Sequence, residues 1–131
     1  MNLHEYQAKE LLREYGITTP RGVVVENTQH AEIATNELGG NAWVVKAQIH
    51  AVGRGKAGGV KLVKSVDELR QVADALLGKP LVTYQNAPPG QQVSRVLIEE
   101  TLRIAPELYL SFLLDRESAR VTVVASSPRR R

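Results

Sequence analysis

The sequence contains no cysteine, and aromatic side chains are scarce, with one Trp, one Phe and four Tyr in 131 residues. The lack of cysteine excludes disulfides, zinc–thiolate sites and a cysteine nucleophile. No apolar run approaches the roughly 18 residues that a membrane-spanning helix needs. The amino terminus also lacks the basic and apolar regions of a signal peptide. We therefore expect a cytoplasmic protein without a membrane partner.

An excess of charge of one sign is also lacking over most of the chain. Three of the 17 basic residues are Arg129, Arg130 and Arg131. The rest of the chain contains 14 basic and 14 acidic residues, so its formal net charge is zero. A nucleic-acid-binding domain normally carries its positive charge as a patch within the fold. We therefore expect no nucleic-acid partner, and the remaining composition is that of an ordinary globular domain.

Three segments have the apolar periodicity and the end signals of helices. We expect these helices at about 3–15, 29–38 and 66–77, with Asn2, Thr28 and Ser65 as their N-caps. The first helix presents an apolar face made of Leu3, Tyr6, Leu11, Leu12 and Tyr15.

Short runs rich in β-branched residues lie between and after these helices and are typical of strands. We expect strands at 22–26, 42–47, 60–63, 81–84, 93–99, 108–114 and 121–125, the last two joined by a turn at Asp115 to Ser118. This order of elements predicts an α+β (mixed α/β) fold around a largely antiparallel sheet.

The most informative stretch runs from residue 43 to residue 61. A predicted strand supplies one lysine, Lys46, and a loop with glycines at positions 53, 55, 58 and 59 then leads into the next strand. Glycines let the backbone approach a ligand closely and aim several N–H groups at one anion. With the basic residues Lys46, Arg54, Lys56 and Lys61, the pattern indicates a clamp for a polyphosphate.

Two common phosphate-binding motifs do not fit this loop. Gly53 to Gly58 match GxGxxG, but that motif opens a helix, whereas a strand is predicted at 60–63. A Walker A loop fails because Ala57 and His50 occupy the places of its Ser or Thr and its first glycine. A flexible, solvated hairpin loop without a ligand is the alternative that the loop alone leaves open. RNA binding is a less well supported interpretation of this loop, because no aromatic residues are interleaved for bases to stack on.

Segments well beyond the loop resemble the beta subunits of succinate–CoA ligases. They are Met1–Lys9, Trp43–Lys61, Leu81–Gln85, Glu107–Leu110 and Asp115–Arg116, and the register holds from Met1 to about Ser126. The resemblance implies the amino-terminal region of an ATP-grasp fold, with residues 1–126 as a partial nucleotide-binding domain. Val52 stands where the family usually has glycine.

The resemblance also implies which residues bind ATP or ADP. They are Lys46, Gly53, Arg54, Gly55, Glu99, Leu102 and Glu107. Lys46 would contact the phosphates under the glycine-rich loop, Glu99 and the backbone near Leu102 would meet adenine, and Glu107 would bind the ribose hydroxyls. The acids could instead be ordinary surface residues. His50 is interpreted as a loop residue, and His4 and His30 as helix-surface residues.

The sequence departs from the family after Ser126, where the family continues with Glu-Gly-Gly. Residues 127–131 are therefore interpreted as a basic tail foreign to the family, produced by a frameshift or early stop, or else by a cloning artefact. The family's Mg²⁺ ligands and its region of contact with the alpha subunit lie further downstream. We expect neither a metal ligand nor a catalytic residue in this chain, and no activity from it alone.

Full-length members of this family join succinate to CoA with the use of ATP, and they work together with an alpha subunit. The resemblance therefore implies the nucleotide-binding portion of such a beta subunit. The alternatives are a malate–CoA ligase or related acyl-CoA synthetase subunit, and a non-catalytic truncated fragment.

Overall fold

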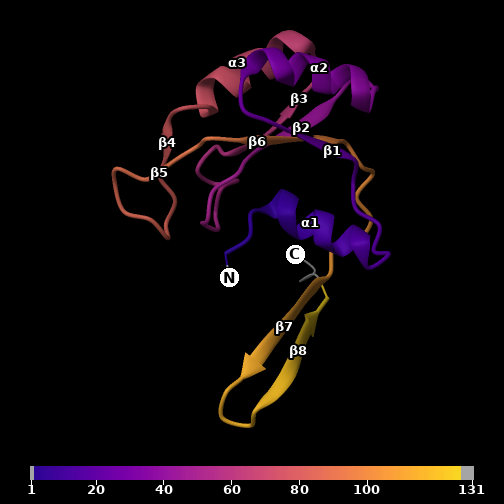
Figure 1. Cartoon of the computed structure of the whole chain (residues 1–131), viewed down its shortest axis with the longest axis vertical. Coiled ribbons are helices and arrows are strands. Elements are labelled where there is room, and N and C mark those ends of the chain that lie inside the picture. Colours follow the sequence, from indigo (N-terminus) through magenta and orange to yellow (C-terminus); the bar gives the residue numbers. More distant parts are fainter. Residues whose placement is uncertain (1, 128–131) are drawn as a thin grey trace. The chain divides into compact units, whose positions relative to one another are not determined.

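A computed structural model describes residues 2–127 of the chain (Figure 1). In chain order its elements are α1 (Glu5–Glu14), β1 (Gly22–Val25), α2 (Thr28–Leu38), β2 (Trp43–Ala47), β3 (Val60–Val63), α3 (Val66–Leu76), β4 (Pro80–Leu81), β5 (Gln91–Gln92), β6 (Val96–Glu100), β7 (Tyr109–Asp115) and β8 (Arg120–Ser126). They divide into two compact units, with the boundary between Thr101 and Leu102.

The first unit is built on a four-stranded sheet with the strand order β1-β6-β2-β3. Every neighbouring pair in this sheet is antiparallel, which confirms the predicted arrangement. Helices α2 and α3 cover one face of the sheet, and α1 lies on the other face (Figure 1). The described helices are all too short or too polar to cross a membrane.

Alternation along strand β2 explains how the two faces of the sheet differ. Trp43, Val45 and Ala47 are buried, and they belong to the apolar core that also includes residues of α2 and α3. Successive side chains of a strand point to opposite faces. Val44 and Lys46 therefore point away from this core, toward the side on which α1 lies.

Helix α1 differs from its prediction at both its start and its apolar face. Its N-cap is His4 rather than Asn2, and the His4 N–H donates to Gln7 Oε1 at 2.9 Å. None of its residues is buried, and Tyr15, just beyond its end, is 80% exposed. The expected apolar face therefore does not pack into the core, because polar side chains hold this helix on the sheet instead.

The other two helices are closer to expectation. Helix α2 is capped by Asn27, whose side chain accepts from the N–H of His30, so the predicted cap Thr28 is the first helical residue. Helix α3 is capped by Ser65 as predicted, and the Ser65 hydroxyl accepts from the N–H of Glu68.

The segment between α3 and β6 contains the largest departure from the predicted strands. The strand expected at 81–84 is limited to β4 and pairs with β5, which the pattern did not predict. Asn86 ends it, because its side chain accepts from the N–H of Thr83 and donates to the carbonyl of Leu81 at 3.2 Å. Side-chain bonds of this kind turn the chain out of a ladder.

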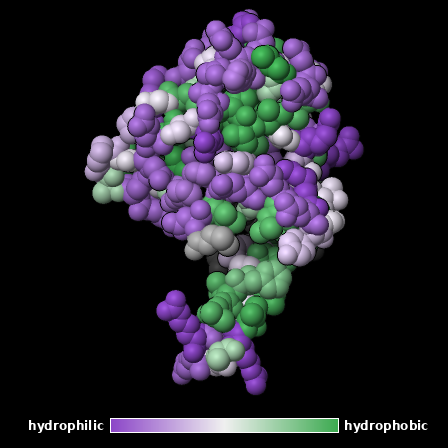
Figure 2. Space-filling view, in the orientation of Figure 1, coloured by the Kyte–Doolittle hydropathy of each residue, from purple (hydrophilic) through white to green (hydrophobic). Residues whose placement is uncertain are grey.

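The second unit is a hairpin of β7 and β8, as predicted from the sequence. Its turn is held by Asp115, whose carboxylate accepts from the N–H of Glu117 and the hydroxyl of Ser118. The register places only apolar side chains on one of its faces, and they are Leu110, Phe112, Leu114, Val121, Val123 and Ala125. Figure 2 shows the strands of this hairpin as hydrophobic surface. Of the predicted tail, residues 128–131 lie outside the described part of the chain.

Candidate anion-binding site

The strand register brings Lys46 and Glu99 together on the face of the sheet that α1 covers. Val44 lies directly opposite Glu99, and Lys46 is two residues further along the same strand. Lys46 and Glu99 are therefore diagonal neighbours on one face, within reach of long side chains. The Lys46 Nζ lies 2.5 Å from Glu99 Oε1, and Glu99 is only 2% exposed.

Helix α1 adds an acid and a base from one of its faces. Glu5 and Lys9 are four residues apart, a spacing that aligns side chains along a helix. The Glu5 Oε1 atom lies 2.8 Å from Lys46 Nζ and 2.9 Å from Lys9 Nζ. Lys9 Nζ in turn lies 2.5 Å from Glu99 Oε2. Ion pairs therefore hold α1 against the sheet, where a core helix would normally use apolar side chains.

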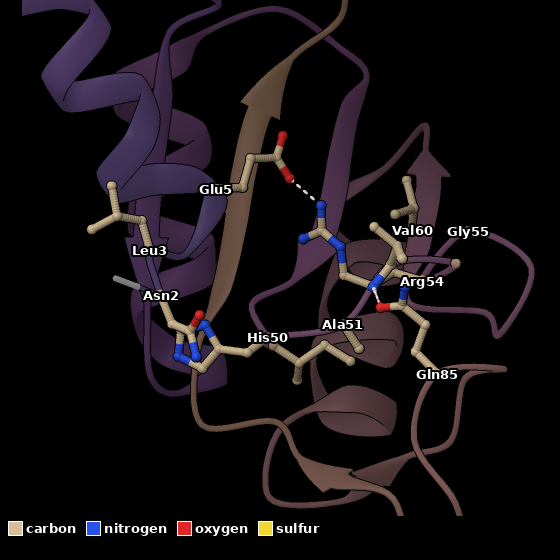
Figure 3. Close-up of a pocket in the computed structure, with 12 residues that line it drawn as sticks. Asn2, Leu3, Glu5, His50, Ala51, Arg54, Gly55, Val60 and Gln85 are labelled. Atoms are coloured by element: carbon tan, nitrogen blue, oxygen red, sulfur yellow. Dashed lines mark hydrogen bonds and ion pairs between the residues drawn. The ribbon is translucent and has the colours of Figure 1, made fainter. Parts of the chain in front are cut away.

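Arg54 joins the same group of charges from the glycine-rich loop. Its Nη2 atom lies 2.5 Å from Glu5 Oε2, and its Nη1 donates to the carbonyl of Ala47 at 2.6 Å. Figure 3 shows the Glu5 carboxylate and the Arg54 guanidinium pointing toward each other. We call Glu5, Lys9, Lys46, Arg54 and Glu99 the charged cluster, which contains three cations and two carboxylates.

The protonation states of the charged cluster follow from these bonds. Burial of Glu5 opposes its ionised form, but hydrogen bonds from Lys46, Lys9 and Arg54 outweigh burial and lower its pKa to about 2. Burial of Lys46 opposes its charge in the same way, but its bonds to Glu5 and Glu99 raise its pKa. Both groups are therefore charged at neutral pH.

The glycine-rich loop has a defined conformation between β2 and β3. The N–H of Ala57 donates to the Gly53 carbonyl at 3.1 Å, and the N–H of Gly59 donates to the Arg54 carbonyl at 2.7 Å. Gly53 has a φ of 83°, and a Cβ there would lie 2.4 Å from the Tyr84 ring. The backbone conformation of Gly53 thus favours glycine, and a Cβ there would displace the exposed Tyr84 ring.

Side chains from the following segment brace the first half of this loop. Gln85 Oε1 accepts from the N–H of Val52 at 2.8 Å (Figure 3), and Gln91 Oε1 accepts from the N–H of His50 at 2.7 Å. Val52 does not have a positive φ. The backbone at this position therefore does not require the glycine that the family usually has there.

A pocket of about 550 Å³ opens beside the loop. Glu5, Gly53, Arg54 and Gly55 contribute to its wall. Within residues 2–127, the N–H groups of Gly53, Arg54 and Gly55 donate no hydrogen bond. Consecutive free N–H groups of this kind form a concavity that suits an anion.

The structure places five of the seven predicted site residues in the first unit. Lys46, Arg54 and Glu99 belong to the charged cluster, and Gly53 and Gly55 line the pocket beside it. Leu102 and Glu107 belong to the second unit, where both are exposed and precede β7. Their contacts with adenine and ribose remain predictions, as does that of Glu99.

Sequence reasoning missed Glu5 and Lys9 as members of the site. The available signal was an acid and a base four residues apart on one predicted helix. His4 was interpreted as a helix-surface residue, but its ring stacks on that of His50 with centroids 3.9 Å apart. Its Nδ1 atom is buried without a hydrogen-bond partner among the described residues.

A divalent metal needs several oxygen or nitrogen ligands that converge on one point. Across residues 2–127, no group of three or more His, Asp or Glu side chains is arranged to hold one. Glu5 and Glu99 are instead bonded to cationic side chains.

An antiparallel sheet that carries a lysine beside a glycine-rich hairpin loop, with helices on its other face, defines a nucleotide-binding lobe of the ATP-grasp class. The family described as "ATP-grasp domain" matches residues 2–128, and the chain belongs to this family.

Among curated proteins, the chain is similar to beta subunits of succinate–CoA ligase (ADP-forming). It is 67% identical over 127 residues to the subunit from Thiobacillus denitrificans and 62% identical over 127 residues to the subunit from Methylobacillus flagellatus. Each match covers 97% of this chain and 33% of the relative. The chain therefore spans about a third of the length of these relatives.

Solved structures share the fold at lower sequence identity. An acetyl-coenzyme A synthetase 1 from Ca. Korarchaeum cryptofilum, in complex with coenzyme A, Ca-AMPCP and HgCl+, matches with a TM-score of 0.74 and 23% identity. The match covers 95% of this chain and 53% of that one. A phosphoribosylamine–glycine ligase from Thermotoga maritima matches with a TM-score of 0.62 and 21% identity over 92% of this chain and 27% of that one.

Proposed function

We propose that this chain is the nucleotide-binding part of a succinate–CoA ligase beta subunit that works in the cytoplasm. The whole enzyme would join succinate to CoA while it converts ATP to ADP and phosphate, with an alpha subunit as its partner and Mg²⁺ bound elsewhere. The names and the high identity of the curated relatives support this proposal.

The observation that carries nucleotide binding is the position of Glu5. A single carboxylate bonds Lys46 and Arg54 at once, beside a pocket lined by Gly53, Arg54 and Gly55. The N–H groups of these three residues donate no hydrogen bond within residues 2–127. The first unit thus already holds one anion between the strand and the loop. Phosphate oxygens of ATP would bind at the same place, with Lys46 as their charged partner and the loop N–H groups as donors.

The remaining contacts follow the family pattern. Glu99 and the backbone near Leu102 would face adenine, and Glu107 would accept from the ribose hydroxyls. A carboxylate can accept from two neighbouring hydroxyls, and main-chain groups at the end of a strand offer the donor and acceptor that the edge of adenine needs.

Calorimetric titration of ATP into the 131-residue chain tests this proposal. Lys46→Ala should weaken binding by ~1–3 kcal/mol, the range for loss of a charged hydrogen bond. Lys79→Ala removes one positive charge at an exposed position outside the charged cluster and should leave the affinity unchanged. Equal affinity of the parent chain and Lys46→Ala would refute the assignment.

A further inference from the structure

We propose that Glu5 is a built-in competitor of the nucleotide phosphates and thereby sets the affinity of the site. Its carboxylate lies between Lys46 and Arg54, at the place that phosphate oxygens would take. This inference rests on the proposed function, because it concerns the same two cations.

Both carboxylate oxygens of Glu5 are committed to cations. Oε1 lies 2.8 Å from Lys46 Nζ and 2.9 Å from Lys9 Nζ, and Oε2 lies 2.5 Å from Arg54 Nη2. A phosphate oxygen that reached Lys46 and Arg54 would need the same donor N–H groups. The two anions therefore compete for donors, and they also repel each other.

Glu5 differs from Glu99, the other carboxylate of the charged cluster, in its access to the pocket. The Glu5 side chain is 21% exposed and lines the pocket, whereas the Glu99 side chain is 3% exposed and does not. A ligand that enters the pocket therefore meets Glu5 first. Glu99 is the more deeply buried partner of Lys46 and Lys9.

The attachment of α1 makes such an exchange feasible. This helix buries no residue, and its described bonds to the sheet side are polar, such as the one from the Tyr6 N–H to Gln48 Oε1 at 3.1 Å. Withdrawal of the Glu5 side chain alone would therefore break polar contacts and leave the other contacts of α1 in place. The carboxylate can give way to a stronger anion without disruption of the core.

The charge balance gives the expected sign of a substitution. With Glu5 ionised, the charged cluster has three cations and two carboxylates, and Glu5→Gln raises its net charge by one. Loss of the ion pairs should lower the stability of the fold, whereas loss of the competitor should strengthen the binding of polyphosphate. A residue with a purely structural role would weaken both.

The test compares the parent chain with Glu5→Gln by calorimetry with ATP and with inorganic triphosphate, and by thermal unfolding. Glu5→Gln should bind both ligands about fivefold more tightly, which corresponds to one unit-charge interaction at 4 Å in water. Its unfolding temperature should fall. The matched control is Glu26→Gln, which removes one negative charge from the exposed pair with Arg95 and should leave the affinity unchanged.

Each outcome separates this inference from the proposed function. Equal or weaker binding by Glu5→Gln, while the parent and Glu26→Gln bind, overturns the inference and leaves nucleotide binding intact. Absence of binding in all three proteins refutes the proposed function together with the inference. If Glu5→Gln does not fold, Glu5→Asp replaces it as the test variant. The shorter aspartate side chain reaches the cations that pair with Glu5 less well. A folded Glu5→Asp should bind triphosphate more tightly than the parent, and weaker binding would overturn the inference.

Discussion

The carboxylate of Glu5 on helix α1 lies 2.5 Å from the guanidinium of Arg54 in the glycine-rich loop, 49 positions along the chain. The same guanidinium donates to the carbonyl of Ala47 at the end of β2. The Arg54 side chain therefore links helix α1 to the end of β2, and the backbone N–H of Arg54 donates no hydrogen bond within residues 2–127.

This arrangement predicts that Arg54 stabilises the protein more than a typical surface arginine does. Arg54→Ala removes the donors to Glu5 and Ala47 and should lower the free energy of unfolding by ~1–3 kcal/mol. Arg70→Ala breaks only exposed ion pairs with Glu32 and Asp67, and the expected loss is smaller. Urea denaturation of both variants checks the difference, and equal losses would contradict this role of Arg54.

Two glycines of the loop form a matched pair for a second prediction. Gly53→Ala places a Cβ at a positive φ and against Tyr84, and it should destabilise the chain by ~1–2 kcal/mol. A Cβ at Gly55 meets nothing within 4 Å and has no positive φ, so Gly55→Ala should be tolerated. Thermal unfolding of the two variants measures this contrast. Greater destabilisation by Gly55→Ala would show that the loop has another conformation.

The glycine-rich loop illustrates what the sequence could predict. A strand, one lysine and four closely spaced glycines are local features, and so is the strand that follows them. The cluster built around Lys46 was not predictable in the same way, because Glu5, Lys9 and Glu99 come from elements far apart in sequence. Only the register of β2 with β6 and the placement of α1 bring these charges together.

Helix α1 shows the converse case, in which a local pattern misled. Its apolar residues have helical spacing, and that spacing predicted one apolar face. In the structure the sheet side of this helix carries Glu5 and Lys9, while Leu11 and Leu12 are exposed. A periodicity identifies a helix, but it does not determine which face meets the sheet.

The stack of His4 on His50 predicts a pH dependence of stability. Burial, followed by the nearby His50, Arg95 and Arg54, lowers the pKa of His4 below 6.5. As the pH falls, His4 therefore becomes protonated at a higher pH in the unfolded chain than in the folded chain. The free energy of unfolding should then decrease as the pH falls below about 6.5. His4→Gln should reduce the fall in unfolding temperature between about pH 7.5 and about pH 5.5.

The control for this prediction is His30→Gln, because His30 is exposed on α2. This variant should retain the pH dependence of the parent chain. Identical pH profiles for His4→Gln and the parent would remove His4 as the cause.

The exposed apolar face of the β7–β8 hairpin indicates that the chain self-associates. A two-stranded hairpin that exposes an entirely apolar face is a surface on which protein chains aggregate. Phe112→Ser on that face should reduce concentration-dependent association in sedimentation experiments. Thr122→Ser on the opposite face is the control. No difference between these two variants would show that this apolar face does not drive association.

The central claim is that polyphosphate binds to Lys46 and to the backbone N–H groups of Gly53, Arg54 and Gly55 in the glycine-rich loop. An NMR titration of the ¹⁵N-labelled chain with ATP tests it most directly. We predict saturable shifts of the backbone amides of Gly53, Arg54 and Gly55, and their loss in Lys46→Ala. ATP-induced shifts confined to other segments, or shifts of these amides that persist unchanged in Lys46→Ala, would contradict the account.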